Sequence, residues 1–277
     1  MLKTLRSIVL YSALISISSI ILVSAIVNWS TEPSNDRNWN ADQAVLPYAE
    51  IRENLISVHN IRNFTYASTT SYTPNYYDKT FDLNKLKKVY YIVEPFSGFV
   101  GSAHTFLSFE FENDQFLAVS VEIRKEQGEK FSAFKGLFNS YELMYVLADE
   151  RDAVKLRSNY RKDQVYVYPV KTTQAKAQDL FMSIITRVNT LKDKPEFYNS
   201  ITSNCTTNIV EHVNAITPNK VPFSFAFVMP GFSDKLAYKL GLLDTDLPIE
   251  QAREKYLINE RALKFADDPE FSKRIRE

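Results

Sequence analysis

The chain has 277 residues, of which 45% are hydrophobic and 24% are charged, enough for one large globular domain with its own core. Lysine and arginine total 33, as do aspartate and glutamate, so no net field favours nucleic acid as a partner. Aromatic residues make up 13% and only 6 residues are glycine, which argues against a disordered chain. Neither a glycine-rich phosphate loop nor a cluster with zinc-ligand spacing is present, so we expect no cofactor and no metal.

The N-terminus carries a membrane-targeting signal. Lys3 and Arg6 precede an uncharged, mostly aliphatic run over residues 7–27, about the length that crosses a hydrocarbon core of roughly 30 Å. Positive charge before this run and acidic residues after it predict a cytoplasmic N-terminus. Residues 23–25 also fit a signal-peptidase cleavage site, so a cleaved signal peptide is the alternative to a retained anchor.

Three regions follow from this pattern. We expect a membrane anchor or signal over residues 1–28, a polar tether over 29–40 and one exported domain over 41–277. The exported part contains no stretch with the composition of a linker between domains.

Periodicity predicts the elements of the exported domain. Asp42 is expected to cap a helix that runs to about Ser57, and residues 60–82, rich in tyrosine, threonine and asparagine, are expected to be irregular. Runs of β-branched and aromatic residues predict strands at 89–93, 104–111, 116–124, 141–147 and 165–170. Helices are predicted at 173–191, from Cys205 to before Pro218, and through the tail 233–277 with breaks at Pro248 and Pro269. This mixture predicts an α+β fold.

The strands 104–111 and 116–124 are the best hairpin candidate. Their apolar faces must be buried on the same side, which restricts the register to alternate values. A three-residue loop over 112–114 satisfies this restriction, pairs Phe109 with Leu117 and sets His104 directly across from Glu122.

A five-residue loop would instead set His104 opposite Arg124, with Glu122 one diagonal step away. Either register leaves the carboxylate within reach, because even diagonal neighbours lie only about 7–8 Å apart. A carboxylate beside an imidazole fixes its tautomer and stabilises the imidazolium. The alternative is an ordinary strand histidine beside a cross-strand ion pair of Glu122 and Arg124.

Cys205 is the single cysteine of the chain, so an exported domain offers it no disulfide partner. A buried free cysteine is often a small hydrophobe. Cys205, however, follows the polar run 199–204 and opens an apolar helical pattern, which places it in the first turn of a helix. The helix dipole and unsatisfied N–H groups there favour a thiolate and can hold an oxyanion. His212 lies two turns further along this helix, roughly 10 Å away, too far to serve Cys205.

Several motifs in order resemble the Lnb N-terminal periplasmic domain family, over about residues 39–271. The motifs are Asn60–Phe64, Tyr76–Asp78, Ala103–Phe109, Ser120–Arg124, Asp149–Asp152 and Asn204–Thr207. The order of a histidine first and an Asn-Cys pair later is also similar to circularly permuted papain-like enzymes such as relatives of lecithin:retinol acyltransferase. These resemblances imply a papain-like antiparallel sheet packed on helices.

The resemblance further implies roles for individual residues. Cys205 would be the nucleophile, His104 the base and Glu122, or Ser120, the group that orients the base. Asn204 and the backbone N–H of Cys205 would hold an oxyanion, and Arg124 is expected to support the site. The dense cluster Glu150–Asp152, with Arg157, is interpreted as a salt-bridge network that holds strand to helix.

By the same resemblance, the implied activity is acyl transfer to or from a lipid-linked or lipoprotein substrate. The enzyme would sit at the bacterial inner membrane, with one pass through it and the domain in the periplasm. A papain-like cell-wall amidase or peptidase is the alternative with the same chemistry. A non-catalytic envelope scaffold or binding protein is the alternative from another class.

Overall fold

The computed structural model describes residues 11–12, 15–16, 18–19 and 32–277. Most of the expected anchor over 1–28, and the start of the tether, lie outside these residues. Within the described part, no helix combines the length and apolar character needed to cross a membrane.

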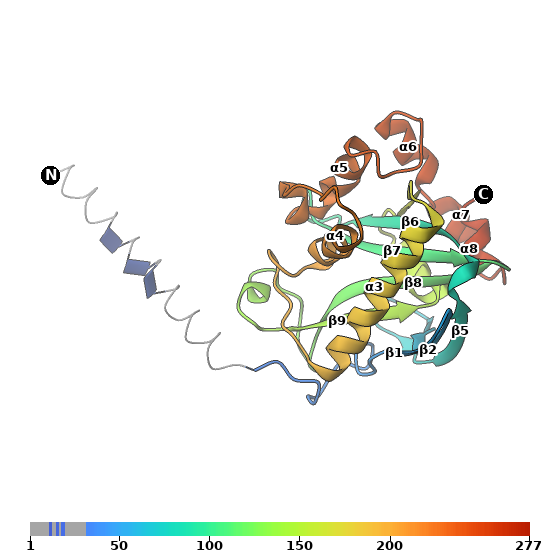
Figure 1. The fold of residues 1–277 in the computed structure, drawn as a ribbon. Coiled ribbons are helices and arrows are strands. Elements are labelled where there is room, and N and C mark those ends of the chain that lie inside the picture. Colours follow the sequence, from blue (N-terminus) through green and yellow to red (C-terminus); the bar gives the residue numbers. More distant parts are fainter. Residues whose placement is uncertain (1–10, 13–14, 17, 20–31) are drawn as a thin grey trace.

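One large sheet forms the centre of the domain (Figure 1). Its strands are β1 (Tyr48–Arg52), β2 (Leu55–Arg62), β5 (Tyr76–Asp82), β6 (Leu86–Pro95), β7 (Ala103–Phe111), β8 (Gln115–Arg124), β9 (Glu142–Ala148) and β10 (Tyr166–Pro169). They follow the order β1-β2-β9-β8-β7-β6-β10, with β5 paired to β2. The pairings are antiparallel except where β2 meets β9. A separate small sheet pairs β3 (Thr65–Tyr66) with β4 (Tyr72–Thr73).

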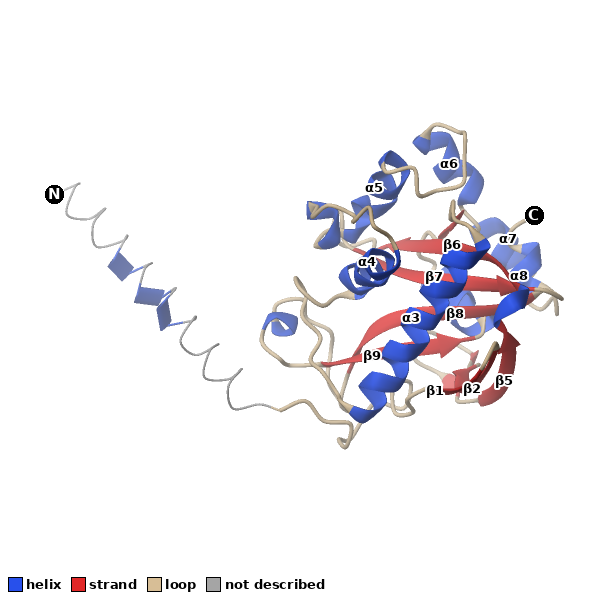
Figure 2. Ribbon diagram, viewed as in Figure 1, coloured by secondary structure: helices blue, strands red, loops and turns tan. Residues whose placement is uncertain are grey.

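The described part also contains seven α-helices (Figure 2). They are α2 (Glu150–Lys155), α3 (Gln174–Asp193), α4 (Cys205–Ile216), α5 (Ser233–Lys239), α6 (Ile249–Tyr256), α7 (Asn259–Lys264) and α8 (Phe271–Arg274). The structure is therefore a mixed α+β domain, as the sequence predicts.

Helices cover both faces of the sheet. On one face, Leu107 and Phe109 pack with Phe181 of α3 and Ile209 of α4. On the other, Phe106 belongs to a second apolar cluster that includes residues of α2, α7 and α8. The central strands β6 to β9 are thus buried on both sides, which makes them a rigid platform for side chains at their ends.

The hairpin of β7 and β8 has the predicted three-residue loop. Phe109 faces Leu117, and the turn residues Asn113 and Asp114 adopt positive φ angles of 58° and 53°. Asparagine and aspartate tolerate this left-handed conformation better than other non-glycine residues, so the loop sequence suits its geometry. This register, and not the five-residue alternative, sets His104 across from Glu122.

The prediction of a helix from Asp42 to Ser57 is wrong. β1 and β2 form a hairpin there, with Arg52 paired to Leu55 and Glu53 at a φ of 53° in the turn. Ala49 and Ile56 are buried in either reading, so their spacing alone did not distinguish helix from strand. Tertiary contacts hold this segment as strands: β2 pairs with β5 and β9, and the side-chain amide of Asn189, in α3, bonds both the N–H and the C=O of Ala49 at 2.8 Å.

Residues 60–82 are more regular than expected, because β5 pairs with β2 and the β3–β4 hairpin lies between them. The aromatic side chains of this segment pack on one another: Phe64 stacks on Tyr72 with ring centroids 5.3 Å apart. The remaining predicted strands are present. So are the helix after Thr173, the helix that begins at Cys205 and a helical tail whose α6 follows Pro248.

The predicted salt-bridge network is present at Glu150 and Asp152, but Arg157, which was expected to join it, pairs with Glu94 and Glu122 instead. The buried Asp152 carboxylate accepts hydrogen bonds from Arg62, from the backbone of Phe64 and from the hydroxyl of Tyr66, all at 2.9 Å. Glu150 pairs with Arg276, which ties α2 to the C-terminus. The network therefore joins β2, the β3 strand and the last residues of the chain to α2.

Replacing Asp152 with alanine should destabilise the domain by about 3–5 kcal/mol, because the Arg62 charge would stay buried without its partner. Thermal unfolding of the full chain in detergent, followed by circular dichroism, measures this loss. The matched control is Asp267→Ala, since that carboxylate is 98% exposed beside Lys155 and should leave the melting temperature nearly unchanged. Equal melting temperatures for the two variants would contradict the assignment.

Candidate active site

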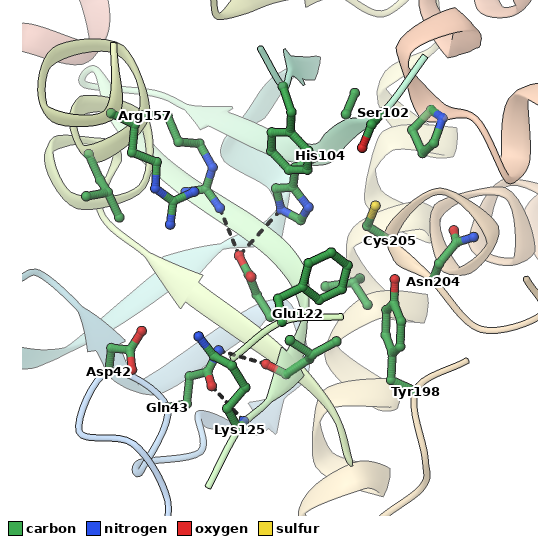
Figure 3. Close-up of a pocket in the computed structure, with 18 of the residues that line it drawn as sticks. Asp42, Gln43, Ser102, His104, Glu122, Lys125, Arg157, Tyr198, Asn204 and Cys205 are labelled. Atoms are coloured by element: carbon green, nitrogen blue, oxygen red, sulfur yellow. Dashed lines mark hydrogen bonds and ion pairs between the residues drawn. The ribbon is translucent and has the colours of Figure 1, made fainter. Parts of the chain in front are cut away.

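A cavity of about 370 Å³ opens at one end of the sheet (Figure 3). Because the strands are antiparallel, β6 ends, β7 begins, β8 ends and β9 begins at this same end. Loops from these strand ends and the first turn of α4 close around the cavity. Its lining includes Ser102, His104, Glu122, Arg157, Tyr198 and Cys205.

Cys205 is the first residue of α4 and is 7% exposed. The Asn204 side chain caps the helix by accepting hydrogen bonds from the N–H groups of Thr206 and Thr207, both at 2.9 Å. The N–H of Cys205 itself precedes these capped groups and points from the positive end of the helix. The sulfur therefore lies in the first turn of a helix, as the polar run 199–204 followed by an apolar helical pattern predicts.

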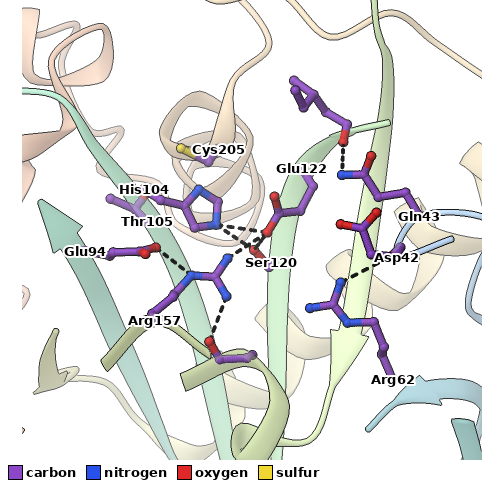
Figure 4. Close-up of polar contacts among 12 residues, drawn as sticks. Asp42, Gln43, Arg62, Glu94, His104, Thr105, Ser120, Glu122, Arg157 and Cys205 are labelled. Carbon is purple, nitrogen blue, oxygen red and sulfur yellow. Dashed lines mark hydrogen bonds and ion pairs between the residues drawn. The ribbon is translucent and has the colours of Figure 1, made fainter. Parts of the chain in front are cut away.

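His104 and Cys205 meet although 101 residues separate them. The hydroxyl groups of Thr105 and Thr206, each next to one of the two site residues, are 2.9 Å apart in a buried contact. This contact joins β7 to the start of α4. In Figure 4 the imidazole ring lies between the sulfur of Cys205 and the carboxylate of Glu122.

The two ring nitrogens of His104 have different partners. Nε2 is 2.6 Å from the Ser120 hydroxyl and 3.4 Å from Glu122 Oε1, and Ser120 in turn donates to the same oxygen at 2.7 Å. Nδ1 is therefore the nitrogen left for Cys205. The arrangement holds the ring in one orientation, with the carboxylate on the nitrogen that faces away from the sulfur.

Charges around this pair favour its ionised form. Burial opposes a charged imidazole, but the Glu122 carboxylate and then the Cys205 sulfur outweigh it and raise the pKa of His104 to about 9. Burial also opposes a thiolate, but the hydrogen bond and charge of His104, helped by Thr105, lower the pKa of Cys205 to about 7. Between these two values the pair exists as thiolate and imidazolium.

Two buried charges behind the pair, Arg157 and Glu94, were not expected in the site. Arg157 donates to Glu122 Oε1 at 2.8 Å and to Glu94 at 2.6 Å (Figure 4). Burial works against ionised Glu122, yet His104 first and then Arg157 hold the pKa of that carboxyl well below its usual range. Glu94 is paired with His104 across β6 and β7, so a glutamate ending the run 89–93 was the signal that pointed to it.

Two expected site residues have other functions. Both amide hydrogens of Asn204 are occupied, because Nδ2 donates to the carbonyls of Ser200 at 3.0 Å and Phe227 at 2.9 Å. Its side chain is therefore a helix cap and not a free oxyanion donor. Arg124 donates to the carbonyl groups of Gln43 and Ala44, so it holds the segment before β1 and not the site.

Tyr198 is a site residue that the sequence did not indicate. Its hydroxyl points toward Cys205 from the opposite wall of the cavity (Figure 3). Burial, and then the negative charge of the Cys205 sulfur, raise the pKa of this phenol, so it stays protonated and able to donate. The Tyr198 O–H and the backbone N–H of Cys205 are thus two donors on the side of the cavity where the sulfur lies.

The other two histidines lie outside the site. The buried ring of His212 contacts the hydroxyls of Tyr145 and Ser183, both at 2.8 Å, and burial lowers its pKa to about 4. His59, in β2, bonds Asp78 of β5 at 2.8 Å. Within residues 32–277 and the six described positions before them, no three metal-ligating side chains gather into a site.

Fold and site together describe a mixed α+β domain with a cysteine–histidine pair between a strand end and a helix N-terminus. The model of the Lnb N-terminal periplasmic domain matches residues 72–230, more than half of the chain, and the chain belongs to that family. The match spans β5 to α4 and includes the cysteine, the histidine and both charges behind them. A periplasmic domain agrees with a location in the cell envelope. Neither a curated protein nor a solved structure matches the chain.

The reactivity of Cys205 toward iodoacetamide should rise through pH 7, and not through the value of about 8.5 typical of a free thiol, because His104 stabilises the thiolate. Below pH 7 the thiolate is protonated and the rate falls. In His104→Ala the rate at pH 7 should drop by about tenfold or more. Since the chain has no other thiol, intact-mass measurement of the adduct follows this residue alone.

His59→Ala is the matched control, since it removes a histidine of β2 that does not line the Cys205 cavity and should leave the pH profile unchanged. A profile centred near 8.5 in both the unmodified protein and His104→Ala would contradict the ion pair.

Proposed function

We propose that this protein is a cysteine-dependent acyl-transfer enzyme of the cell envelope that acts on acyl groups of lipoproteins or phospholipids. The observation that carries the proposal is the placement of Cys205, the first residue of α4, and His104 in the wall of one cavity, with Glu122 and Arg157 behind the imidazole. Covalent catalysis needs a thiolate beside a proton donor and near N–H groups, and these residues meet that need.

In the proposed first half-reaction, the Cys205 thiolate attacks the carbonyl carbon of an ester or amide. The oxyanion that forms accepts hydrogen bonds from the N–H of Cys205 and the hydroxyl of Tyr198. The His104 imidazolium gives its proton to the leaving oxygen or nitrogen, and the carbon–heteroatom bond breaks to leave a thioester on Cys205.

In the second half-reaction, His104, now neutral, takes a proton from the attacking amine or water. The thioester carbonyl is attacked, and the bond to sulfur breaks to restore the thiolate. Glu122 stabilises the imidazolium in both steps, while Arg157 keeps the Glu122 carboxylate ionised. The reaction needs no cofactor, because both steps exchange only protons and the acyl group.

A second cavity favours an acyl substrate over a peptide. It measures about 400 Å³ and lies along α4, and Thr206 and Ile209 of this helix form part of its wall. Its lining is mainly apolar and includes Leu107, Leu180, Val213, Leu236 and Leu243. An apolar chain suits such a lining, whereas the polar stem peptides of cell wall would leave their amide groups unpaired there. The cell-wall amidase stays the second candidate, since the cysteine chemistry would be the same.

Incubating the purified full chain with phospholipid vesicles and a diacylated lipopeptide should produce a fatty acyl thioester on Cys205. Intact-mass spectrometry detects this adduct, and neutral hydroxylamine should release it. Cys205→Ala is the matched control and should show no adduct. Cleavage of peptidoglycan fragments without any lipid adduct would favour the amidase. If the thiol is reactive but neither reaction occurs, the scaffold is favoured.

Tyr198→Phe should slow formation of the acyl-enzyme by about 10²-fold, because it removes one donor to the oxyanion while keeping the ring. The pH profile of Cys205 alkylation should change little, since alkylation forms no oxyanion. Single-turnover measurements beside alkylation rates separate the two effects. Equal losses in both assays would mean that Tyr198 acts on the thiol and not on the oxyanion.

A further inference from the structure

Exposed apolar side chains gather around the mouth of the cavity that holds Cys205. Four loop segments each contribute residues to the lining of this cavity, and we call them the loop rim: 96–102, 130–138, 199–204 and 217–232. Six of their large apolar side chains expose between 55% and 83% of their surface: Phe99, Val100, Phe131, Phe134, Phe223 and Phe225. A cluster of this kind marks an interaction surface, because single exposed apolar residues are ordinary but groups of them are not.

The four segments are in contact with one another. Gly231 N–H donates to the carbonyl of Gly101 at 2.8 Å, Asn204 to that of Phe227 at 2.9 Å, and Ser200 N–H to that of Gly136 at 3.0 Å. The loop rim is therefore one continuous surface, and Phe131 also lines the cavity itself.

The charge of the loop rim indicates what it meets. Its four segments contain no aspartate or glutamate, although the chain has 33 of these residues, and they contain three lysines. The lysines are Lys130, Lys135 and Lys220, and all three are exposed. Aromatic side chains interspersed with lysines, without acidic residues, suit the interface of a bilayer that carries anionic lipids.

The N-terminal part of the chain meets the domain at the end that carries the loop rim. Ser34 N–H donates to Glu142 at 3.2 Å, at the start of β9 and just after the 130–138 segment. The continuous described segment, 32–277, therefore begins beside the loop rim (Figure 1). Four residues separate the end of the uncharged run at residue 27 from Glu32, so the span between them is at most about 18 Å.

We infer that the loop rim docks onto an anionic lipid bilayer, with its phenylalanines in the interface and the mouth of the Cys205 cavity against the membrane surface. This contact is separate from any anchor at residues 1–28 and fixes which end of the domain faces the lipid. It does not depend on the proposed acyl transfer, because a binding protein could dock in the same way.

The test places a tryptophan on the loop rim of the full chain, in vesicles of phosphatidylethanolamine and phosphatidylglycerol that contain brominated lipid. Phe225→Trp and Phe134→Trp are the two probes, and the emission of the unmodified chain is subtracted. Leu263→Trp is the matched control, since Leu263 is 61% exposed on α7, far from the loop rim. Circular dichroism verifies that each variant is folded.

Interfacial side chains sit about 5–10 Å into the headgroup region, so bromine should quench roughly half of the emission added at positions 225 and 134, and little of that at 263. Quenching should weaken when phosphatidylglycerol is replaced with phosphatidylcholine, because the lysines lose their anionic partners. Quenching at both rim positions no stronger than at 263 would overturn the proposal and point to a protein partner for this surface. Because the readout is fluorescence, it is independent of whether Cys205 carries an acyl group.

Discussion

The Glu122 carboxylate lies between two cations, the His104 imidazolium and the Arg157 guanidinium, and the site depends on this placement. Arg157 is in turn paired with Glu94, so charges alternate from the Cys205 sulfur inward to a completely buried carboxylate. A single ionised group would be costly at this depth, but His104, Glu122, Arg157 and Glu94 each have an opposite charge within 3.4 Å. Arg157 helps to lower the pKa of Glu122, Glu122 raises the pKa of His104, and His104 lowers the pKa of the Cys205 thiol.

The fold supplies this chain of charges from four elements that meet at one end of the sheet. β6 carries Glu94, β7 carries His104, β8 carries Glu122, and the π-helical turn after α2, Leu156–Arg161, carries Arg157. Packing on both faces makes the strands rigid, so their end residues stay in fixed positions. α4 approaches the same end with its N-terminus, and the buried contact of two threonines sets its position relative to β7.

The surroundings of the site connect its chemistry with its location. The cavity that contains Cys205 lies at the start of α4, the apolar cavity lies along the same helix, and the exposed phenylalanines belong to the loop rim. The Lnb family match covers the helix and both strands of the hairpin, so this arrangement lies within the part of the chain that defines the family. The papain-like likeness of the fold stays a prediction, since it was inferred from the order of the histidine and the cysteine.

Local patterns in the sequence determined the parts of the site that lie within one element or one hairpin. The alternation of apolar residues and the turn residues Asn113 and Asp114 specify a single register, which sets His104 across from Glu122. The cap at Asn204 likewise specifies where α4 begins and hence that Cys205 lies in its first turn.

The tertiary structure alone decided which groups from distant segments would meet. It brought Arg157 and Tyr198 to the site and occupied the amide hydrogens of Asn204. It also held β1 and β2 as strands, through the pairing of β2 with β5 and β9 and the contact of Ala49 with Asn189. The reason is physical: periodicity and capping act over a few residues, whereas pairing of buried charges and hydrogen bonds depends on which surfaces the whole chain brings together.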